Sequence, residues 1–184
     1  MALPWTFVRQ VHGARVLVVD GAVVEPVEAD AIVTTSPATA LGVLGADCAL
    51  VGLASPEGVI GVAHAGWRGL AAGVVEEVAA AMRQRGASAI EAVVSACIHA
   101  ECYPFGTAEL AALCGRLGAG VAATAADGSP GLDLPAAVRG RLATAGVDLV
   151  GEVGECTACS GAYFSYRGRR DTGRHLLGVW LESR

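Results

Sequence analysis

Two histidines and one cysteine have the side chains of a transition-metal site, because neutral imidazole and thiolate are the donors that such metals prefer. His12 lies in "RQVHGARV", Cys48 in "GADCALV" and His64 at the end of "GVIGVAHA". All three fall at the ends of apolar segments, where functional sites tend to be built. A His-Cys-His site is therefore one interpretation. The other is a pair of hydrogen-bonded structural histidines and an inert buried thiol, since the spacing matches no short zinc motif.

The segment "HAGWRG", residues 64–69, indicates a second kind of chemistry. Its small residues permit a close turn into a helix, whose N-terminus offers free N–H groups to an anion such as phosphate. Arg68 adds a forked, charged donor in the same turn, whereas Trp67 is expected to contribute packing. Four more arginines follow in "YFSYRGRRDTGR", residues 163–174. Arg167 is the phosphate-binding candidate among them, and the alternative for this run is a solvated loop.

Four further cysteines form two pairs, Cys97 with Cys102 and Cys156 with Cys159. Their C-x4-C and C-x2-C spacings can assemble a structural four-cysteine zinc site, although "CTACSG" is also typical of a strand end followed by a turn. Redox chemistry at the second pair would need a helix start after a strand, and "SGAYFSY" has no helical pattern. We expect reduced thiols rather than a disulfide framework, because no export signal is visible.

Short apolar runs bounded by Gly, Pro, Asp or Ser predict the elements that must position these residues. The expected strands are 14–20, 30–35, 49–55, 58–65, 91–97, 147–152 and 175–182. The expected helices are 69–85, 107–117 with Thr107 as its cap, and 134–145 with Asp133 as its cap and Pro135 in its first turn. Residues 124–131 form the one loop-like, low-complexity segment. This alternation predicts an α/β or α+β fold with a mixed sheet.

Composition narrows the class of protein further. The chain has 184 residues, of which 53% are hydrophobic, so we expect a single domain over residues 1–184. A net charge of −5 and the lack of a clustered basic face argue against a nucleic-acid partner. The longest apolar segment is interrupted by Asp47, so we predict no membrane span. The N-terminus shows no signal peptide, and we expect a cytoplasmic protein.

Six motifs together resemble the laccase-domain family, also labelled polyphenol oxidase or peptidoglycan-editing factor. They are "QVHG" at 10–13, "ADC" at 46–48, "AHAGWRG" at 63–69, "ACIHAECY" at 96–103, "CT" at 156–157 and "FSYR...TGR" within 164–174. Their order and spacing extend over nearly the whole chain, and "AHAGWRG" is highly specific for the family. The resemblance implies an α+β fold with mixed sheets in a four-layer α/β/β/α arrangement, which toxin-type cysteine hydrolases share.

The resemblance implies a zinc-dependent purine nucleoside phosphorylase that also deaminates adenosine. The expected small-molecule partners are phosphate and adenosine, inosine, guanosine or methylthioadenosine, and no protein partner is predicted. The family's zinc ligands fall on His12, Cys48 and His64, and three protein ligands leave one zinc position open for chemistry. Arg68 and Arg167 are the candidates for holding phosphate. Asp47 is a candidate for orienting a ligating imidazole.

The chain departs from the family pattern in two places. Members carry an N-terminal segment ahead of "QVHG" that we expect this chain to lack, and "GPCIGPCCYEVG" becomes "SACIHAECYPFG" at residues 95–106. Two alternative functions remain. One is a cysteine hydrolase in peptidoglycan precursor editing, with Cys48 as nucleophile and His64 as base. The other is a copper-dependent polyphenol oxidase. Such an enzyme needs several histidine-rich copper sites, and the four histidines of this chain are too few to supply them.

Overall fold

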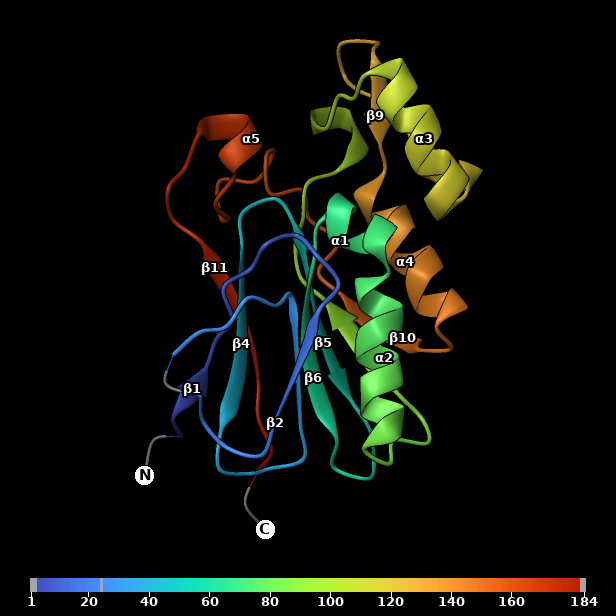
Figure 1. Ribbon diagram of the computed structural model, residues 1–184. Helices are drawn as coiled ribbons and strands as arrows, with labels where there is room; N and C mark the ends of the chain where they lie inside the picture. The colour runs from blue at the N-terminus through green and yellow to red at the C-terminus, as the bar shows by residue number, and fades with distance from the viewer. Residues whose placement is uncertain (1–2, 24, 183–184) are drawn as a thin grey trace.

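A six-stranded mixed sheet forms the centre of the computed structural model, which describes residues 3–23 and 25–182 (Figure 1). Its spatial order is β10-β7-β5-β6-β3-β2, with bounds Asp148–Glu152, Glu91–Val94, Ala49–Ala54, Ile60–Ala65, Ala31–Thr34 and Val16–Val19. The central pairs β7–β5, β5–β6 and β6–β3 are antiparallel, and the outer pairs β10–β7 and β3–β2 are parallel. Strands β3 and β6 are buried along their whole length, as their continuous apolar sequences predict for strands covered on both faces.

Two helices cover one face of this sheet (Figure 1). Helix α2 (Val74–Gln84) buries Val75, Val78 and Met82 against the sheet, and α4 (Leu134–Thr144) packs beside it. The carboxylate of Asp133 caps α4 by accepting a hydrogen bond from the Ala136 N–H at 2.8 Å. The short helix α1 (Trp67–Ala72) connects β6 to α2.

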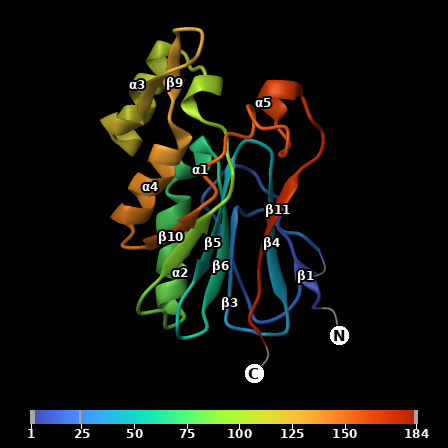
Figure 2. The same cartoon turned by 180° about the vertical axis from the view of Figure 1, so that it is seen from behind.

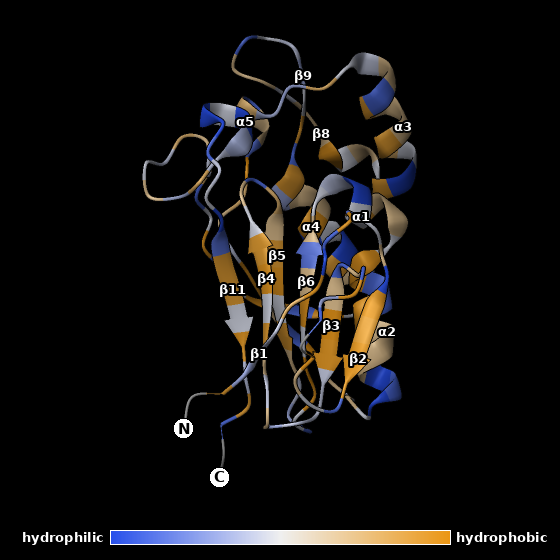
Figure 3. Cartoon of the chain, turned by 60° about the vertical axis from the view of Figure 1, so that its left-hand side comes forward, coloured by the Kyte–Doolittle hydropathy of each residue, from blue (hydrophilic) through white to orange (hydrophobic). Residues whose placement is uncertain are grey.

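A three-stranded sheet covers the opposite face of the six-stranded sheet. It consists of β1 (Trp5–Thr6), β4 (Ala40–Gly45) and β11 (His175–Val179) in the order β1-β4-β11, and in Figure 2 these strands lie on the right, on the opposite side of the molecule from α2 and α4. Leu41 and Val43 of β4 pack onto Ile32, Leu50 and Val62 and form a second hydrophobic core with them. Figure 3 shows the orange colour of hydrophobic residues along strands of both sheets, for example β3 and β4.

The remaining elements lie at the end of the molecule where β6 leads into α1 (Figures 1 and 2). They are α3 (Thr107–Leu117), the hairpin of β8 (Ala122–Thr124) and β9 (Pro130–Leu132), α5 (Tyr166–Arg169), and the 3-10 turns η1 (Ala100–Cys102) and η2 (Ala119–Val121). The hairpin turn lies within the predicted loop 124–131. This end of the fold carries the candidate site.

The α+β class and the mixed sheets are confirmed, and every predicted strand contains a strand of the structure. Over residues 3–23 and 25–182 we see three of the four expected layers, namely helices and two sheets. The outer face of the three-stranded sheet exposes Trp5, Leu44 and Leu176. Within the same residues, no helix has the length and apolar character that crossing a membrane requires.

Three local expectations were wrong. The predicted helix 69–85 is two helices, because Gly73 adopts φ +93°, a left-handed conformation that ends α1 and begins α2. Thr107 is the first residue of α3 and not its cap, since Gly106 holds the cap position. Strand β4 was not expected at all. Its sequence ALGVLG has little β-branched character, and it forms a strand because β1 and β11 pair with it from the two ends of the chain.

Candidate functional site

The structure brings His12, Cys48 and His64 together although 52 positions separate the outer two in sequence. Their metal-binding atoms all lie within 4.8 Å of one another, and the two imidazole rings are 4.8 Å apart at an angle of 77°. Strand pairing explains the approach: Leu50 of β5 lies opposite His64 of β6, so the turn before β5 places Cys48 beside the end of β6. His12 enters from the turn before β2.

A buried carboxylate, Asp30, holds two of these residues in place. Its Oδ1 lies 2.9 Å from Nδ1 of His64, and the same atom accepts the backbone N–H of His12 at 2.9 Å. Its Oδ2 accepts the N–H groups of Val11 at 3.2 Å and Gly13 at 2.7 Å. His12 has φ +60°, a left-handed conformation that these backbone bonds stabilise. Asp30 therefore directs the other ring nitrogen of His64 toward the cluster and leaves the His12 side chain exposed to the cleft.

The electrostatics of the cluster favour a thiolate beside a charged imidazole in the absence of metal. Burial acts to raise the pKa of Cys48, but hydrogen bonds from His12 and His64 outweigh it and lower the pKa to about 7. Burial likewise opposes protonation of His64, while its bonds to Asp30 and Cys48 raise the pKa to about 9. For Asp30, burial is outweighed by the His64 bond and three backbone N–H groups, which hold its pKa below the usual range. A cluster with this charge distribution has the features of a functional site.

Two glycines of "HAGWRG" make room for the donors. A Cβ on Gly66 would lie 2.7 Å from Sγ of Cys48 and 3.3 Å from Cδ2 of His12, closer than side chains tolerate. A Cβ on Gly69 would lie 3.0 Å from the Gly13 carbonyl oxygen. These glycines therefore have a packing role: they let the α1 turn approach the residues it contacts. Helix α1 is also only six residues long.

Asp47 does not orient an imidazole, contrary to the sequence-based expectation. Its Oδ1 accepts hydrogen bonds from Thr157 Oγ1 at 2.8 Å and Ser165 Oγ at 2.6 Å, and its Oδ2 accepts the Arg167 N–H at 2.6 Å. Asp47 is buried and has φ +89°. Its carboxylate thus anchors the first turn of α5, where a negative charge is favourable, and so positions the backbone of Arg167.

A cleft of about 700 Å³ opens above the three donors. His12, Cys48, His64, Arg68 and Arg167 all line it, so the structure brings together every predicted site residue. Each of the two arginines lies against an aromatic ring. The Cζ atom of Arg68 is 4.4 Å from the centre of the Trp67 ring, and that of Arg167 is 5.1 Å from the centre of the Tyr103 ring. Both arginines are exposed, and both line the cleft.

Two further arginines of the run 163–174, Arg170 and Arg174, also line this cleft. Arg170 has φ +59° and ends helix α5, so its backbone leaves the helix there. Its side chain nevertheless lines the cleft. Trp67 packs edge-on against Phe105, as expected, and in addition supports Arg68. The cleft therefore combines a cluster of metal donors at its base with four guanidinium groups on its walls.

Sequence reasoning missed Asp30 and Tyr103. The signal for Asp30 was present, because a carboxylate directly before the buried run "AIVT" needs several hydrogen-bond partners. Of these two aspartates, only Asp47 was considered as a partner for a ligating histidine. Tyr103 gave no comparable signal, since an aromatic residue in a loop is most simply explained by packing.

The structure rearranges the predicted set of four cysteines. Glu101, Cys102, Cys156 and Cys159 offer ligand atoms within 4.8 Å of one another, whereas Cys97 does not belong to this group. Cys97 lies in the core, where burial and then the nearby charges of Glu152 and Cys156 raise the pKa of its thiol. An acidic side chain therefore takes the place that the sequence analysis gave to Cys97.

Comparison with curated proteins gives relatives that cover most of the chain. Purine nucleoside phosphorylase ORF3 of Streptomyces griseus is 41% identical over 182 residues, which are 96% of this chain and 74% of that protein. The purine nucleoside phosphorylase of Xylella fastidiosa strain Temecula1 is 38% identical over 188 residues, covering 95% of this chain and 71% of its own length.

Solved structures show the same fold. A Neisseria meningitidis protein assigned to DUF152 superposes with a TM-score of 0.86 at 30% identity, over 98% of this chain and 76% of its own. The Bacillus licheniformis hypothetical protein YfiH also gives 0.86, at 26% identity, over 97% of this chain and 74% of its own. The family described as multi-copper polyphenol oxidoreductase laccase matches residues 1–182. With the "AHAGWRG" turn, the three clustered donors and these relatives in agreement, the chain belongs to this laccase-domain family.

Proposed function

We propose that this chain is a zinc-dependent purine nucleoside phosphorylase that also deaminates adenosine. The observation that carries the proposal is the convergence of His12, Cys48 and His64 at the base of a cleft whose walls bear Arg68 and Arg167. The names of the relatives from Streptomyces griseus and Xylella fastidiosa support the phosphorylase activity. A cytoplasmic location, in which thiols stay reduced, is part of the proposal.

The residues present fit a zinc ion. Two imidazole nitrogens and one sulfur are a donor set that zinc binds, and three protein ligands are the number found in catalytic rather than structural zinc sites. His64 has the buried carboxylate partner that commonly orients a ligating histidine. The Cβ-free position at Gly66 keeps the space beside the Cys48 sulfur open. His12, Cys48 and His64 would therefore hold the ion.

Bound zinc would supply a Lewis acid that stabilises negative charge on a substrate oxygen. The guanidinium groups of Arg68 and Arg167 are suited to bind phosphate through paired, charged hydrogen bonds. Trp67 and Tyr103 support them from behind and limit their motion. The cleft volume of about 700 Å³ lies in the range of pockets that enclose a small organic ligand, which suits a nucleoside and a phosphate ion.

The proposed phosphorolysis joins a phosphate oxygen to C1′ of the ribose while the bond from C1′ to the purine nitrogen breaks. The electron pair of that bond leaves with the base, which takes up a proton, and the products are ribose 1-phosphate and the free purine. Adenosine, inosine, guanosine and methylthioadenosine are the proposed substrates. In the deamination, a water oxygen forms a bond to C6 of adenosine and ammonia leaves.

Phosphate-dependent release of the base tests the phosphorylase. Zinc-loaded protein is incubated with inosine or adenosine, with and without orthophosphate, and ribose 1-phosphate is followed by phosphorus NMR. We expect product only with phosphate, loss of the product and of the zinc held by Cys48 in Cys48→Ser, and no change in Cys114→Ser. Cys114 lies on α3, away from both cysteine-containing clusters, and is a matched control. Failure of the zinc-loaded protein to release base in the presence of phosphate would contradict the proposal.

A cysteine hydrolase, for example one that acts on peptidoglycan precursors, is the second candidate. It is favoured by the pairing of Cys48 with two histidines, which lowers the pKa of the thiol to about 7. A nucleophilic cysteine must be free to attack, whereas a zinc ligand is already bound. Iodoacetamide should therefore modify Cys48 in metal-free protein and leave it unmodified in zinc-loaded protein. Rapid modification in the zinc-loaded state would favour the hydrolase.

The copper oxidase finds less support in the donor set. Multi-copper oxidases bind several copper ions through many histidines, and this chain has four, of which only His12 and His64 lie in the cluster. A phenol oxidation assay with copper-loaded protein distinguishes this function from the other two.

A further inference from the structure

A second group of metal-binding side chains lies outside the cleft. It consists of Glu101 and Cys102 in η1 and of Cys156 and Cys159 in the turn after β10. We propose that these four residues bind a second, structural zinc ion that joins the η1 segment to the 156–159 turn. The proposal stands on this juxtaposition and does not rest on the phosphorylase function.

The geometry of the cluster is that of a site with four protein donors. All four ligand atoms lie within 4.8 Å of one another. The sulfurs of Cys102 and Cys159 are 3.3 Å apart, and the Cys159 sulfur is 3.6 Å from Oε1 of Glu101. Three thiolates and a carboxylate are ligands that zinc accepts, and four protein ligands close its tetrahedral coordination sphere. Such closed sites contribute to folding and not to chemistry.

The backbone around the cluster is already arranged for thiolate ligands. The N–H of His99 donates a hydrogen bond to Sγ of Cys156 at 3.4 Å and fixes the position of that sulfur. The Ser160 N–H donates to the Cys156 carbonyl at 2.9 Å, so the chain turns back between Cys156 and Cys159 and brings both sulfurs to the same side. Cys97 and Cys156 form a parallel bridge that fixes the two segments side by side.

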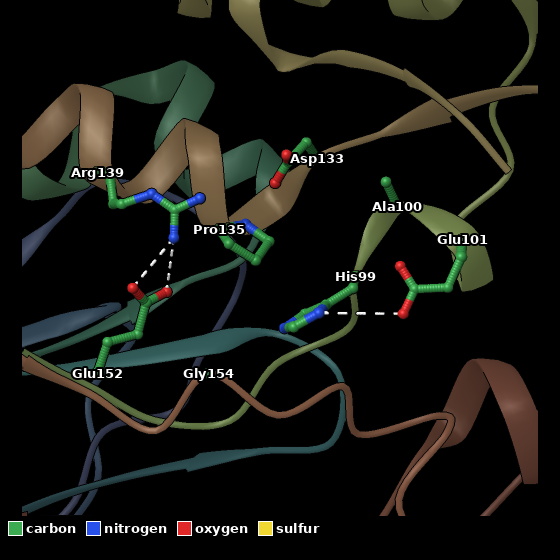
Figure 4. A pocket seen from close by; sticks show the side chains of 8 residues that line it. All are labelled: His99, Ala100, Glu101, Asp133, Pro135, Arg139, Glu152 and Gly154. Atoms are coloured by element: carbon green, nitrogen blue, oxygen red, sulfur yellow. Dashed lines mark hydrogen bonds and ion pairs between the residues drawn. The ribbon is translucent and has the colours of Figure 1, made fainter.

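The Glu101 carboxylate has no arginine partner in the adjoining pocket. Figure 4 shows that pocket, in which the cation of Arg139 is paired with Glu152 at 2.9 Å while Glu101 lies beside His99. The distance from Nδ1 of His99 to Oε1 of Glu101 is 3.9 Å, too long for a hydrogen bond. Glu101 thus places a carboxylate beside three sulfurs, and a divalent cation would balance the negative charge of this group.

A disulfide between Cys102 and Cys159 would use only two of the four converging groups. The buried Cys156 and the Glu101 carboxylate would then face a site without a partner for either. A single zinc ion uses all four groups at once. We therefore assign the cluster to zinc, and the disulfide is the outcome that the experiment must separate from it.

The two segments that this zinc would join both support the cleft. Tyr103 directly follows Cys102, and its ring lies beneath Arg167. Thr157 lies between the two cysteines of the turn and donates to Asp47 at 2.8 Å, and Asp47 in turn accepts the Arg167 N–H. Occupation of the second site would therefore stabilise the wall that carries Arg167 without contacting the substrate.

Zinc content of the full chain tests the assignment. The protein is purified under reducing conditions without chelators, and zinc per chain is measured by mass spectrometry for the unchanged protein, Cys102→Ser/Cys159→Ser, Cys48→Ser and Cys114→Ser. We expect the double variant to lose one zinc per chain and still retain the zinc bound at Cys48, and Cys114→Ser to lose none. If only the zinc site at His12, Cys48 and His64 is wrong, Cys48→Ser keeps all its zinc and the double variant still loses one. If only the phosphorylase activity is wrong, the zinc contents of all variants stay as expected here.

Cobalt substitution keeps the test decisive if the double variant does not fold. Cys159 is exposed, so Cys159→Ser leaves the core intact. Cobalt bound by thiolates gives strong charge-transfer absorption. The Cys48 site would supply one thiolate and the second site three, so we expect Cys159→Ser to lower the absorption by about one quarter and Cys114→Ser to leave it unchanged. Zinc content and cobalt absorption that are the same in all variants would overturn the proposal. So would a Cys102–Cys159 disulfide in metal-loaded, anaerobically purified protein.

Discussion

Oδ1 of Asp30 lies 2.9 Å from Nδ1 of His64, and the same carboxylate accepts the backbone N–H groups of the turn that contains His12. One buried acid thus orients two residues that approach Cys48 from different elements. The relationship depends on the pairing of β3 with β6, in which Ala31 lies opposite Ala63 and the His64 N–H donates to the Asp30 carbonyl at 2.7 Å.

Replacing Asp30 by Asn should weaken zinc binding. The amide keeps the size of the side chain, but it removes the negative charge that supports His64. It also replaces one of the two oxygens that accept backbone N–H groups with an NH2 group, which can only donate. Loss of such a partner typically lowers metal affinity about 10- to 100-fold. Competition with a coloured chelator measures the change. Asp20→Asn, at an exposed carboxylate paired with Arg85, is the control and should leave the affinity unaltered; equal affinities for both variants would show that Asp30 does not act on the metal.

Gly66→Ala should abolish zinc binding at the site of His12, Cys48 and His64 while the fold and the zinc at the second site are retained. The added methyl group would lie 2.7 Å from the Cys48 sulfur and must displace it from the cluster. Gly115→Ala is the matched control, because a Cβ there meets nothing within 4 Å. As an alanine inside α3, it should raise the free energy of unfolding by about 0.5–1 kcal/mol. Zinc content and thermal unfolding of both variants test the prediction, and it is wrong if Gly66→Ala binds zinc normally.

Arg68→Ala and Arg167→Ala should each raise the KM for phosphate about tenfold, because a charged hydrogen bond contributes about 1.5 kcal/mol and 1.4 kcal/mol corresponds to a factor of ten. If the arginines serve binding, kcat changes less than KM. Steady-state kinetics at varied phosphate measure both constants, with Arg116→Ala on α3 as control. A fall in kcat at constant KM would assign the arginines a different role.

A surface contact distant from the site predicts an effect of acid. The hydroxyl and N–H of Ser88 donate to Glu57, and these two bonds lower the pKa of that carboxyl to about 2. A carboxyl with a lowered pKa stabilises the folded state above its ordinary pKa of about 4.3, and this contribution is lost as the pH falls toward 2. An NMR titration should show the pKa of Glu57 rising part of the way toward its ordinary value in Ser88→Ala, since the variant loses the hydroxyl and keeps the backbone N–H. An unchanged titration midpoint in that variant would rule out the Ser88 hydroxyl as a cause.

Much of the fold follows from local sequence patterns. The apolar runs that became β3, β5 and β6 and the capped helix α4 were predictable, because burial periodicity and capping involve residues close together in the chain. Strand β4 was not predictable, since its partners β1 and β11 come from the two ends of the sequence. The break at Gly73 follows from its left-handed conformation, φ +93°, which glycine adopts readily.

The sequence by itself determined the chemical types at the site: two imidazoles and a thiol for metal, and guanidinium groups for an anion. Only the tertiary structure decided which acid supports which group. Asp30, 34 positions from His64, became its partner through strand register, while Asp47 turned to residues 110 to 120 positions away. Glu101 replaced Cys97 beside the other cysteines for the same reason. Hydrogen bonds and metal coordination act over a few ångströms, and chain folding sets which distant side chains come that close.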